Sequence, residues 1–254
     1  MDKTVLSVKN LCAGYGNKEI LHNITLNFDG GKIIAIVGPN GCGKSTLLKT
    51  LIGLVLKTDG DILCDGAPAD SLTSAQRARK IAYLPQSKNI PDLSVMTMVL
   101  HGRFAYLGYP RRYRKEDISA AENALRITEL SQYANENIST LSGGTQQRVF
   151  LAMALAQDSP VILMDEPNSF MDISYQIKFM KLCRHLADEG KTIVMVLHDL
   201  PTALKYADEI AVMSGGEMIS CGTPDEIYNS SVLDRVFAVT IKKIQTDEGI
   251  HYYY

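Results

Sequence analysis

Long apolar runs are absent from this sequence, and no stretch approaches the roughly 18 consecutive apolar residues that a bilayer-spanning helix needs. The first four residues lack the charged leader and apolar segment of a signal peptide. The five cysteines include no C-x-x-C pair, so a reducing cytoplasm is the simplest setting. We therefore predict a cytoplasmic chain, which would rely on other chains for any membrane-spanning part.

An excess of charge of one sign is also missing. The net charge is −2, so no global positive field draws the chain to nucleic acid or to anionic lipid, and either partner would have to be met locally. What the chain does have is size and apolar content. Its 254 residues and 46% hydrophobic residues match one large α/β domain with a sizeable core.

The apolar pattern changes along the chain. Residues 5–29 alternate around a turn at 14–17 and predict an antiparallel strand pair, and short strands are expected at 60–66 and 80–86. Helical spacing replaces strand signals from 93 to 157, notably over 118–130. Strands at 161–164 and 192–197 flank a helical stretch at 176–189, which predicts a parallel sheet with crossover helices.

The C-terminal part gives weaker signals. Residues 208–237 predict two short strands around a glycine pair and then one helix that opens at 223–226. Residues 240–254 predict an edge strand or a loose tail without chemistry.

A glycine-rich stretch follows an apolar strand at 33–37 and leads into a helix. It fits the pattern G-x-x-x-x-G-K-S/T, in which glycines let the backbone curl around an anion at a helix N-terminus. Lys44 would reach the β- and γ-phosphates, Ser45 would ligand Mg²⁺, and Thr46 would bond near the α-phosphate. The loop consists of Gly38, Pro39, Asn40, Gly41, Cys42, Gly43, Lys44, Ser45 and Thr46. A nucleotide site is therefore predicted here.

Acidic and basic residues follow the predicted parallel strands. Asp165 and Glu166 end the strand at 161–164, as in a Walker B element, where one carboxylate holds Mg²⁺ and the next polarises a water. His198 ends the next strand and would face the same pocket, because ligands collect at the carboxyl ends of parallel strands. Tyr15, at the early turn, is either a stacking platform for adenine or ordinary strand packing.

The segment 141–148, LSGGTQQR, decides between classes of nucleotide-binding protein. A serine and two glycines open a predicted helix over 146–157 and make a second anion-binding helix N-terminus. Together with the phosphate loop, Gln86, the two carboxylates and His198 in this order, it resembles the ATP-binding cassette (ABC) family, whose signature reads L-S-G-G-Q. The resemblance covers residues 3 to about 240. Thr145 replaces the signature glutamine, and we expect ATP binding to survive this change.

The resemblance implies a role for each matching residue. Tyr15 corresponds to the adenine-stacking aromatic, Gln86 to a glutamine that contacts Mg²⁺ and water, Glu166 to the general base, and His198 to the switch histidine. Asp172 matches the D-loop aspartate, although the family usually reads S-A-L-D where this chain reads S-F-M-D. The implied ligands are Ser45, Gln86 and Asp165 for Mg²⁺, and for ATP the whole loop 38–46 with Tyr15, Ser142, Gly143, Gly144, Thr145 and Asp172.

The resemblance also implies a fold. It is an α/β P-loop NTPase (RecA-like) core with an N-terminal antiparallel β subdomain and an inserted α-helical subdomain. Residues 1–254 would form a single domain. The core would take 1–86 and 158–240, the helical subdomain 87–157, and the C-terminal strand or tail 241–254.

The implied mechanism needs two copies. In a head-to-tail homodimer, each ATP would lie between the phosphate loop of one subunit and the signature helix of the other, giving two composite sites. ATP binding would close the dimer and hydrolysis would release it. The helical subdomain would pass this motion to integral membrane permease subunits, with a periplasmic or lipoprotein substrate-binding protein involved indirectly. The chain would be peripheral at the cytoplasmic face of the membrane.

Several short strings, at 99–108, 115–117, 153–157 and 171–176, resemble the importers of iron–siderophore, haem and cobalamin (type II importers). Molybdate or tungstate importers of the same architecture share them, so the cargo stays open. A soluble ABC ATPase such as that of iron–sulfur cluster assembly is a further alternative. A P-loop kinase would lack the signature helix.

One cluster favours another class of partner. Basic and aromatic residues interleave over 103–115, as on nucleic-acid surfaces. The members are Arg103, Phe104, Tyr106, Tyr109, Arg111, Arg112, Tyr113, Arg114 and Lys115. Because the cluster lies in the predicted helical subdomain, where the permease docks in the ABC family, we expect no nucleic-acid partner.

Overall fold

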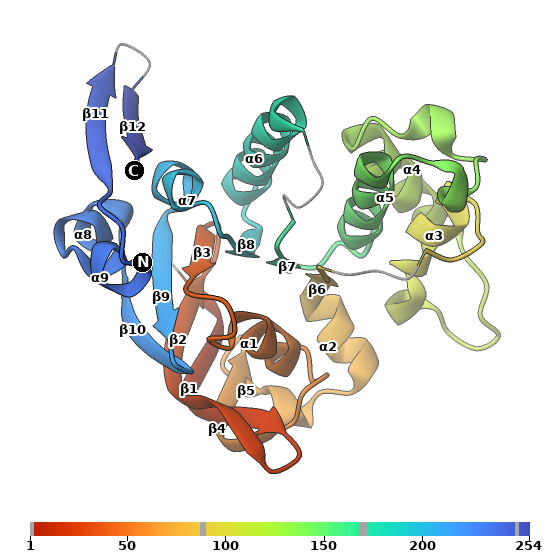
Figure 1. The fold of residues 1–254 in the computed structure, drawn as a ribbon. Helices are drawn as coiled ribbons and strands as arrows, with labels where there is room; N and C mark the ends of the chain where they lie inside the picture. The colour runs from red at the N-terminus through yellow and green to blue at the C-terminus, as the bar shows by residue number, and fades with distance from the viewer. Residues whose placement is uncertain (1–2, 87–89, 168–171, 247–248) are drawn as a thin grey trace.

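The computed structural model describes residues 3–86, 90–167, 172–246 and 249–254 (Figure 1). Three sheets and the helices around them make up this part of the chain. Within it, no helix combines the length and the apolar character that crossing a membrane requires.

The first sheet is antiparallel, with strand order β2-β1-β4-β5. The predicted strand pair over 5–29 is confirmed as β1 (Thr4–Tyr15) and β2 (Lys18–Asp29), joined by the turn at Gly16 and Asn17. The strand predicted at 60–66 begins earlier, as β4 (Lys57–Cys64), and β5 (Ala67–Pro68) pairs with its end.

The second sheet has six strands in the order β10-β9-β3-β8-β7-β6, and all neighbours are parallel except β9 and β10. Its strands are β3 (Ile33–Val37), β6 (Ile81–Leu84), β7 (Val161–Asp165), β8 (Thr192–Val196), β9 (Glu209–Ser214) and β10 (Glu217–Gly222). Every residue of β3, β7 and β8 is buried, as expected of a parallel sheet covered on both faces. The predicted parallel sheet is confirmed.

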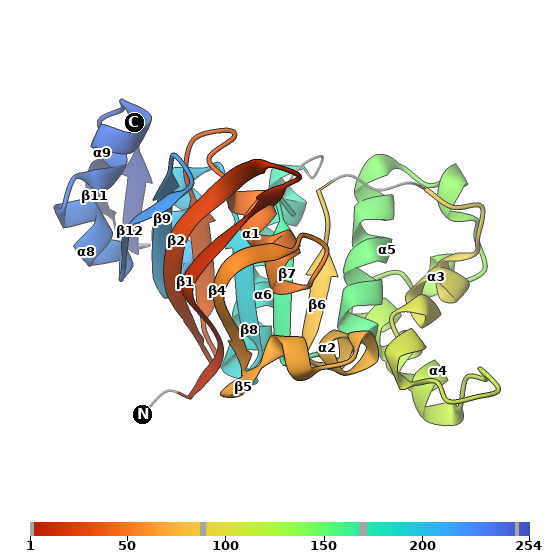
Figure 2. The same cartoon turned by 90° about the horizontal axis from the view of Figure 1, so that it is seen from below.

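The two faces of β3 belong to two cores. Ile33, Ala35 and Val37 join the core on the side of α6 (Ile173–Asp188) and α7 (Leu200–Tyr206). The residues between them join the core of β1, β2 and α1 (Lys44–Leu51). Figure 2 shows the antiparallel sheet curving over the six-stranded sheet.

Between β6 and β7 the described residues form helices, 3₁₀ turns and one isolated β-bridge. After α2 (Ser74–Lys80), which precedes β6, the helices are α3 (Val95–His101), α4 (Lys115–Ile127) and α5 (Gly143–Ala156). The helical character predicted over 93–157 is confirmed. The helix predicted at 118–130 begins and ends three residues earlier. It begins earlier because Asp117 caps its first turn by accepting from the Arg114 N–H. These helices form the right-hand side of Figure 1.

The C-terminal part differs from the prediction. The helix that opens with the capping box of Thr223 and Glu226 ends early, as α8 (Pro224–Asn229), and a separate α9 (Val232–Phe237) follows. Ser231 between them has a φ of 53°, which interrupts helical geometry. The expected edge strand or loose tail is instead a hairpin of β11 (Lys242–Thr246) and β12 (Gly249–Tyr253), with Tyr252 edge-on to Tyr228.

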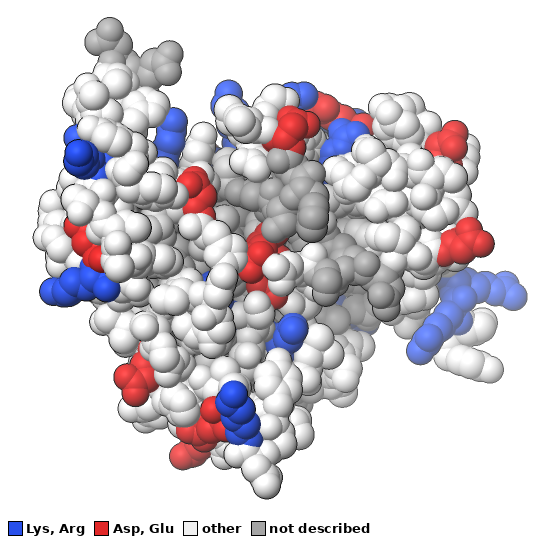
Figure 3. Space-filling view, in the orientation of Figure 1, with Lys and Arg blue, Asp and Glu red and all other residues white. Residues whose placement is uncertain are grey.

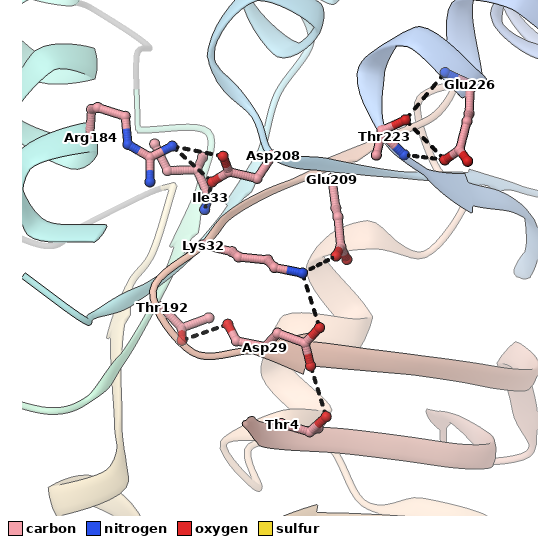
Figure 4. A network of polar contacts seen from close by, with 10 residues as sticks. All are labelled: Thr4, Asp29, Lys32, Ile33, Arg184, Thr192, Asp208, Glu209, Thr223 and Glu226. Carbon is pink, nitrogen blue, oxygen red and sulfur yellow. Dashed lines mark hydrogen bonds and ion pairs between the residues drawn. The ribbon is translucent and has the colours of Figure 1, made fainter. Parts of the chain in front are cut away.

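A polar network joins the antiparallel sheet to the six-stranded sheet at the beginning of β3 (Figure 4). The Lys32 ammonium donates to Asp29 at 3.1 Å and to Glu209 at 2.7 Å, and the Thr4 hydroxyl donates to Asp29 at 2.8 Å. Burial opposes the charge of Asp29, but the hydrogen bonds from Thr4 and Lys32 lower its pKa. The network fixes where the chain leaves one sheet for the other.

Candidate active site

The glycine loop connects the carboxyl end of β3 with α1, as the sequence predicts. Gly43 precedes the helix with a φ of 101°, a left-handed conformation in which an added Cβ would also lie 2.7 Å from Leu21. Gly38 has no room either, since a Cβ there would lie 2.2 Å from the Met213 carbonyl oxygen. Glycine is therefore required at both ends of the turn that wraps the N-terminus of α1.

The side chain of Lys44 points back across the glycine loop. The Lys44 ammonium donates to the carbonyl oxygens of Gly38 and Pro39, at 2.8 and 2.9 Å, and the side chain is almost fully buried. Cys42 is buried as well, with its sulfur 4.0 Å from Lys44 Nζ. The ammonium is thereby fixed beside the exposed backbone of Asn40 and Gly41, where an anion would lie.

Ser45 and Asp165 link the loop to β7. The Ser45 hydroxyl donates to Oδ1 of Asp165 at 2.8 Å, and the Tyr83 hydroxyl lies 3.4 Å from Oδ2. Asp165 is only 2% exposed, and this burial raises the pKa of its carboxyl. Two effects raise the pKa of Tyr83: first its burial, and second the negative charge of Asp165. Its hydroxyl therefore stays protonated and donates. The sequence analysis did not identify Tyr83.

Glu166 lies between two other predicted residues. Its Oε2 accepts from the Gln86 amide at 2.5 Å, and its Oε1 lies 2.5 Å from Nε2 of His198. These partners come from the ends of β6 and β8, the two strands that flank β7 in the sheet. Glu166 has a φ of 52°, a left-handed conformation that is uncommon for a residue with a side chain.

These groups surround a pocket of about 600 Å³. Its lining is Tyr15, Ile20, Asn40, Gly41, Gly43, Lys44, Ser45, Thr46, Gln86, Glu166 and His198. All but one of these were predicted. The exception is Ile20. The sequence feature that could have identified it is its position near the beginning of β2, just after the turn that follows Tyr15. Tyr15 is 51% exposed at the rim. Gly38, Pro39, Cys42 and Asp165 lie in or behind the loop without lining the pocket.

The predicted signature residues do not line this pocket. Ser142 caps α5, and its hydroxyl accepts from the Thr145 N–H at 3.3 Å and lies 2.9 Å from the Thr145 hydroxyl. Ser142 and Gly143 are exposed, and Gly144 is half-buried. This helix N-terminus therefore presents its free N–H groups outward.

Asp172 caps α6 in the same way and accepts from the Tyr175 N–H at 2.9 Å, which lowers the pKa of its carboxyl. The rest of the predicted D-loop, 168–171, lies outside the described residues. Across the described ranges there is no group of three or more His, Cys, Asp or Glu side chains that could hold a metal ion by themselves.

The family model of the ABC transporters matches residues 21–169 of this chain. The chain is 38% identical to the petrobactin import ATP-binding protein FpuD of Bacillus anthracis over 244 residues, 95% of this chain and 89% of the relative. It is 37% identical to the ferric enterobactin transport ATP-binding protein FepC of Escherichia coli, over 91% of this chain and 86% of the relative.

Solved structures of ABC transporters also match this chain. A metal-chelate type ABC transporter in an inward-facing conformation matches with a TM-score of 0.84 at 27% identity, over 99% of this chain and 96% of that one. A dimeric bacterial ABC transporter cassette matches with a TM-score of 0.76 at 32% identity, over 86% of this chain and 98% of that one. Cassettes of this family bind ATP, form dimers and work with membrane permease subunits. This chain therefore belongs to the ABC transporter family and is an ATPase cassette of it.

Proposed function

We propose that this chain is the ATP-hydrolysing subunit of an importer that takes up a metal chelate of the iron–siderophore, haem or cobalamin type across the cytoplasmic membrane. It works as a peripheral subunit on the cytoplasmic face. The observation that carries ATP hydrolysis is Glu166, held between Gln86 and His198 at the edge of the Lys44 pocket. The class of cargo is supported by the relatives, which are import proteins for petrobactin and ferric enterobactin.

In this proposal ATP occupies the 600 Å³ pocket. Tyr15 stacks on the adenine with its exposed ring, and Ile20 adds an apolar wall. The backbone of 38–46 wraps the phosphates, and the Lys44 ammonium moves from the loop carbonyls to the β- and γ-phosphate oxygens. The N–H groups at the N-terminus of α1 add partial positive charge where the phosphates lie.

The donor atoms at the loop fit Mg²⁺, which prefers oxygen ligands from one or two protein groups together with phosphates and water. We assign Ser45 and Asp165 as ligands, with Gln86 nearby, because the Ser45 hydroxyl and the Asp165 carboxylate already lie 2.8 Å apart. When bound, the ion neutralises charge on the β- and γ-phosphates. Asp165 is buried with a raised pKa, and a cation beside it favours the charged carboxylate.

Glu166 accepts a proton from the water that attacks the γ-phosphate. Gln86 and His198 each bind one of its oxygens and so orient the carboxylate, with His198 near the γ-phosphate. Catalysis consists of positioning and charge neutralisation, without a covalent intermediate.

A second copy completes each site in this proposal. The four residues at the start of α5 do not line the pocket of their own chain but present a capped helix N-terminus outward; they are Ser142, Gly143, Gly144 and Thr145. A head-to-tail homodimer brings them to the γ-phosphate of the partner, with Asp172 at the same interface. The free N–H groups of α5 then complement the triphosphate.

The permease contacts the helical subdomain and the groove beside it. A second pocket, of about 640 Å³, lies between α1, α2 and β6. The exposed Leu56 lines it, and the exposed Leu54 lies two residues earlier in the chain. Exposed apolar side chains around a groove are typical of a protein interface. A periplasmic or lipoprotein substrate-binding protein takes part only through the permease.

The test is reconstitution of the chain with its membrane partner in liposomes. ATPase activity and uptake are measured with a ferric siderophore, haem, cobalamin and molybdate in turn. Stimulation by a metal chelate supports the proposal. Stimulation by molybdate alone would show that the cargo is molybdate and not a metal chelate. Failure to associate with any permease would contradict the import function.

A further inference from the structure

A loop on the helical side of the molecule carries charge that the nucleotide site does not use. It connects the 3₁₀ turn η2 (Phe104–Tyr106) with α4. Residues 108–115 contain four basic residues and no acidic one, in a chain whose net charge is −2. We call residues 107–115 the basic loop.

One buried carboxylate holds both the chain that precedes η2 and the end of the basic loop. Asp117 accepts from Nε of Arg103 at 3.0 Å and from the Arg114 N–H at 2.9 Å. The Arg103 guanidinium also donates to the Ala156 carbonyl at 3.0 Å and lies 3.8 Å from the ring centre of Tyr106. The base of the loop is therefore firmly attached to α4 and α5.

A stack of rings supports the same base. His101 and Phe104 stack with ring centres 4.7 Å apart, and Tyr113 stacks on Phe104 at 6.2 Å. These aromatic side chains are occupied with one another. They do not form a free platform of the kind on which nucleic-acid bases stack.

The tip of the loop points outward. Tyr109 is fully exposed, and Arg111 and Arg112 are exposed as well. Neither arginine has a hydrogen bond or an ion pair with any residue that the structure describes. Of the acidic residues at this end of α4, Glu116 is exposed and Asp117 is occupied by Arg103 and Arg114. Figure 3 shows basic side chains projecting at the lower right edge, where the yellow-green loop before α4 lies in Figure 1.

The 3₁₀ turn η2, which leads into the basic loop, contacts α2, a helix that lines the groove we assign to the permease. Arg79 of α2 donates to the Ala105 carbonyl at 2.8 Å and lies 5.2 Å from the Tyr106 ring centre. Arg77 and Ala78 of the same helix line the 640 Å³ groove.

We propose that the basic loop binds anionic lipid headgroups at the cytoplasmic surface of the membrane, beside the permease. Clustered Arg and Lys side chains are attracted to anionic lipids, and tyrosine favours the headgroup level of a bilayer. The inference rests on the proposed function, which brings the cassette to the membrane. The lipid contact helps to hold the cassette at the membrane and to orient it, in addition to the contact with the permease.

The test uses the purified full chain, without permease, and flotation with vesicles. One set of vesicles is pure phosphatidylcholine, and the other also contains phosphatidylglycerol. We expect the chain to float with the anionic vesicles only and to be released by salt, because surface charge is screened. Each basic residue contributes about fivefold to partitioning, so Arg111→Gln with Arg112→Gln should weaken binding by roughly thirtyfold.

A matched control removes the same charge elsewhere. Lys181→Gln with Lys242→Gln changes two exposed lysines on α6 and β11 and should leave flotation unchanged. Tyr109→Ala should weaken binding without altering its salt dependence. ATP binding by each variant is measured separately, so a failure of the nucleotide site is distinguished from a failure of lipid binding.

Three outcomes would overturn the lipid proposal. Equal flotation with neutral vesicles would remove the role of headgroup charge, and equal loss in both double variants would show a net-charge effect without a site. A requirement for Arg111 and Arg112 only in binding to permease held in neutral-lipid nanodiscs would identify an acidic protein surface as the partner.

Discussion

The hydroxyl of Ser45 donates a 2.8 Å hydrogen bond to Oδ1 of Asp165, a residue 120 positions further along the chain. The bond joins the first turn of α1 to the last residue of β7. It therefore holds together the phosphate loop and the strand-end carboxylate, the two parts that a nucleotide with its metal ion would bridge.

Glu166→Gln should abolish turnover while ATP binding persists. The amide cannot accept the proton of the attacking water, and loss of a general base costs about 10²- to 10⁴-fold in rate. We expect a dimer that stays closed on ATP, visible as a larger species in size-exclusion chromatography. Glu122→Gln, an exposed residue of α4, is the control. Hydrolysis at the wild-type rate in Glu166→Gln would show that another group is the base.

Ser142→Arg should stop hydrolysis without loss of ATP binding to the isolated chain. The long side chain would cover the N–H groups at the start of α5, which the proposed partner needs, while the pocket around Lys44 lies elsewhere. ATP affinity and ATP-dependent dimerisation are measured in parallel. Ser119→Arg, on the exposed surface of α4, should keep both properties. Activity that survives Ser142→Arg would argue against a composite site.

Tyr83→Phe should weaken the response to Mg²⁺. The change removes the hydroxyl that lies 3.4 Å from Oδ2 of Asp165 and lets this carboxylate rotate. Since the contact is long, we expect a rise of about threefold to tenfold in the Mg²⁺ concentration for half-maximal ATP binding, at or below the lower end of outer-shell effects. ATP binding without Mg²⁺ should not change. Tyr133→Phe is the control, and an unaltered Mg²⁺ titration would contradict the role of Tyr83.

Asp29→Ala should lower the free energy of unfolding by about 1–3 kcal/mol, because Thr4 and Lys32 lose a half-buried charged acceptor. The pKa of Asp29 is lowered in the folded chain. Its contribution is therefore complete above the pKa of the unfolded chain, about 3.9, and is lost as the pH falls through the lower folded value. Denaturant unfolding between pH 7 and acid should show a smaller loss for Asp29→Ala than for wild type. Parallel curves would contradict the assignment.

Local chemistry explains why the sequence predicts so much of this site. Gly38 and Gly43 are needed where no side chain fits, and the run from Val161 to Met164 is apolar because a parallel strand is buried on both faces. Such requirements act on neighbouring residues, so they leave a readable pattern. Ser142 likewise caps the helix that follows it.

The C-terminal region shows where local patterns fail. Residues 240–254 alternate weakly, and their pairing into β11 and β12 depends on contacts with α7 and α8 that no spacing encodes. The break between α8 and α9 depends on the left-handed conformation of Ser231.

The sequence by itself determined that the chain is a nucleotide-binding cassette, that two carboxylates end a buried strand, and that Ser142 caps the helix that follows it. Only the tertiary structure decided that Gln86 and His198 grip the two oxygens of Glu166, that Tyr83 reaches Asp165, and that Ser142 lies away from the pocket of its own chain. The reason is physical: conformational needs of the backbone act between neighbours, whereas the partners of a side chain follow from the strand order β3-β8-β7-β6, which packing of the whole chain sets.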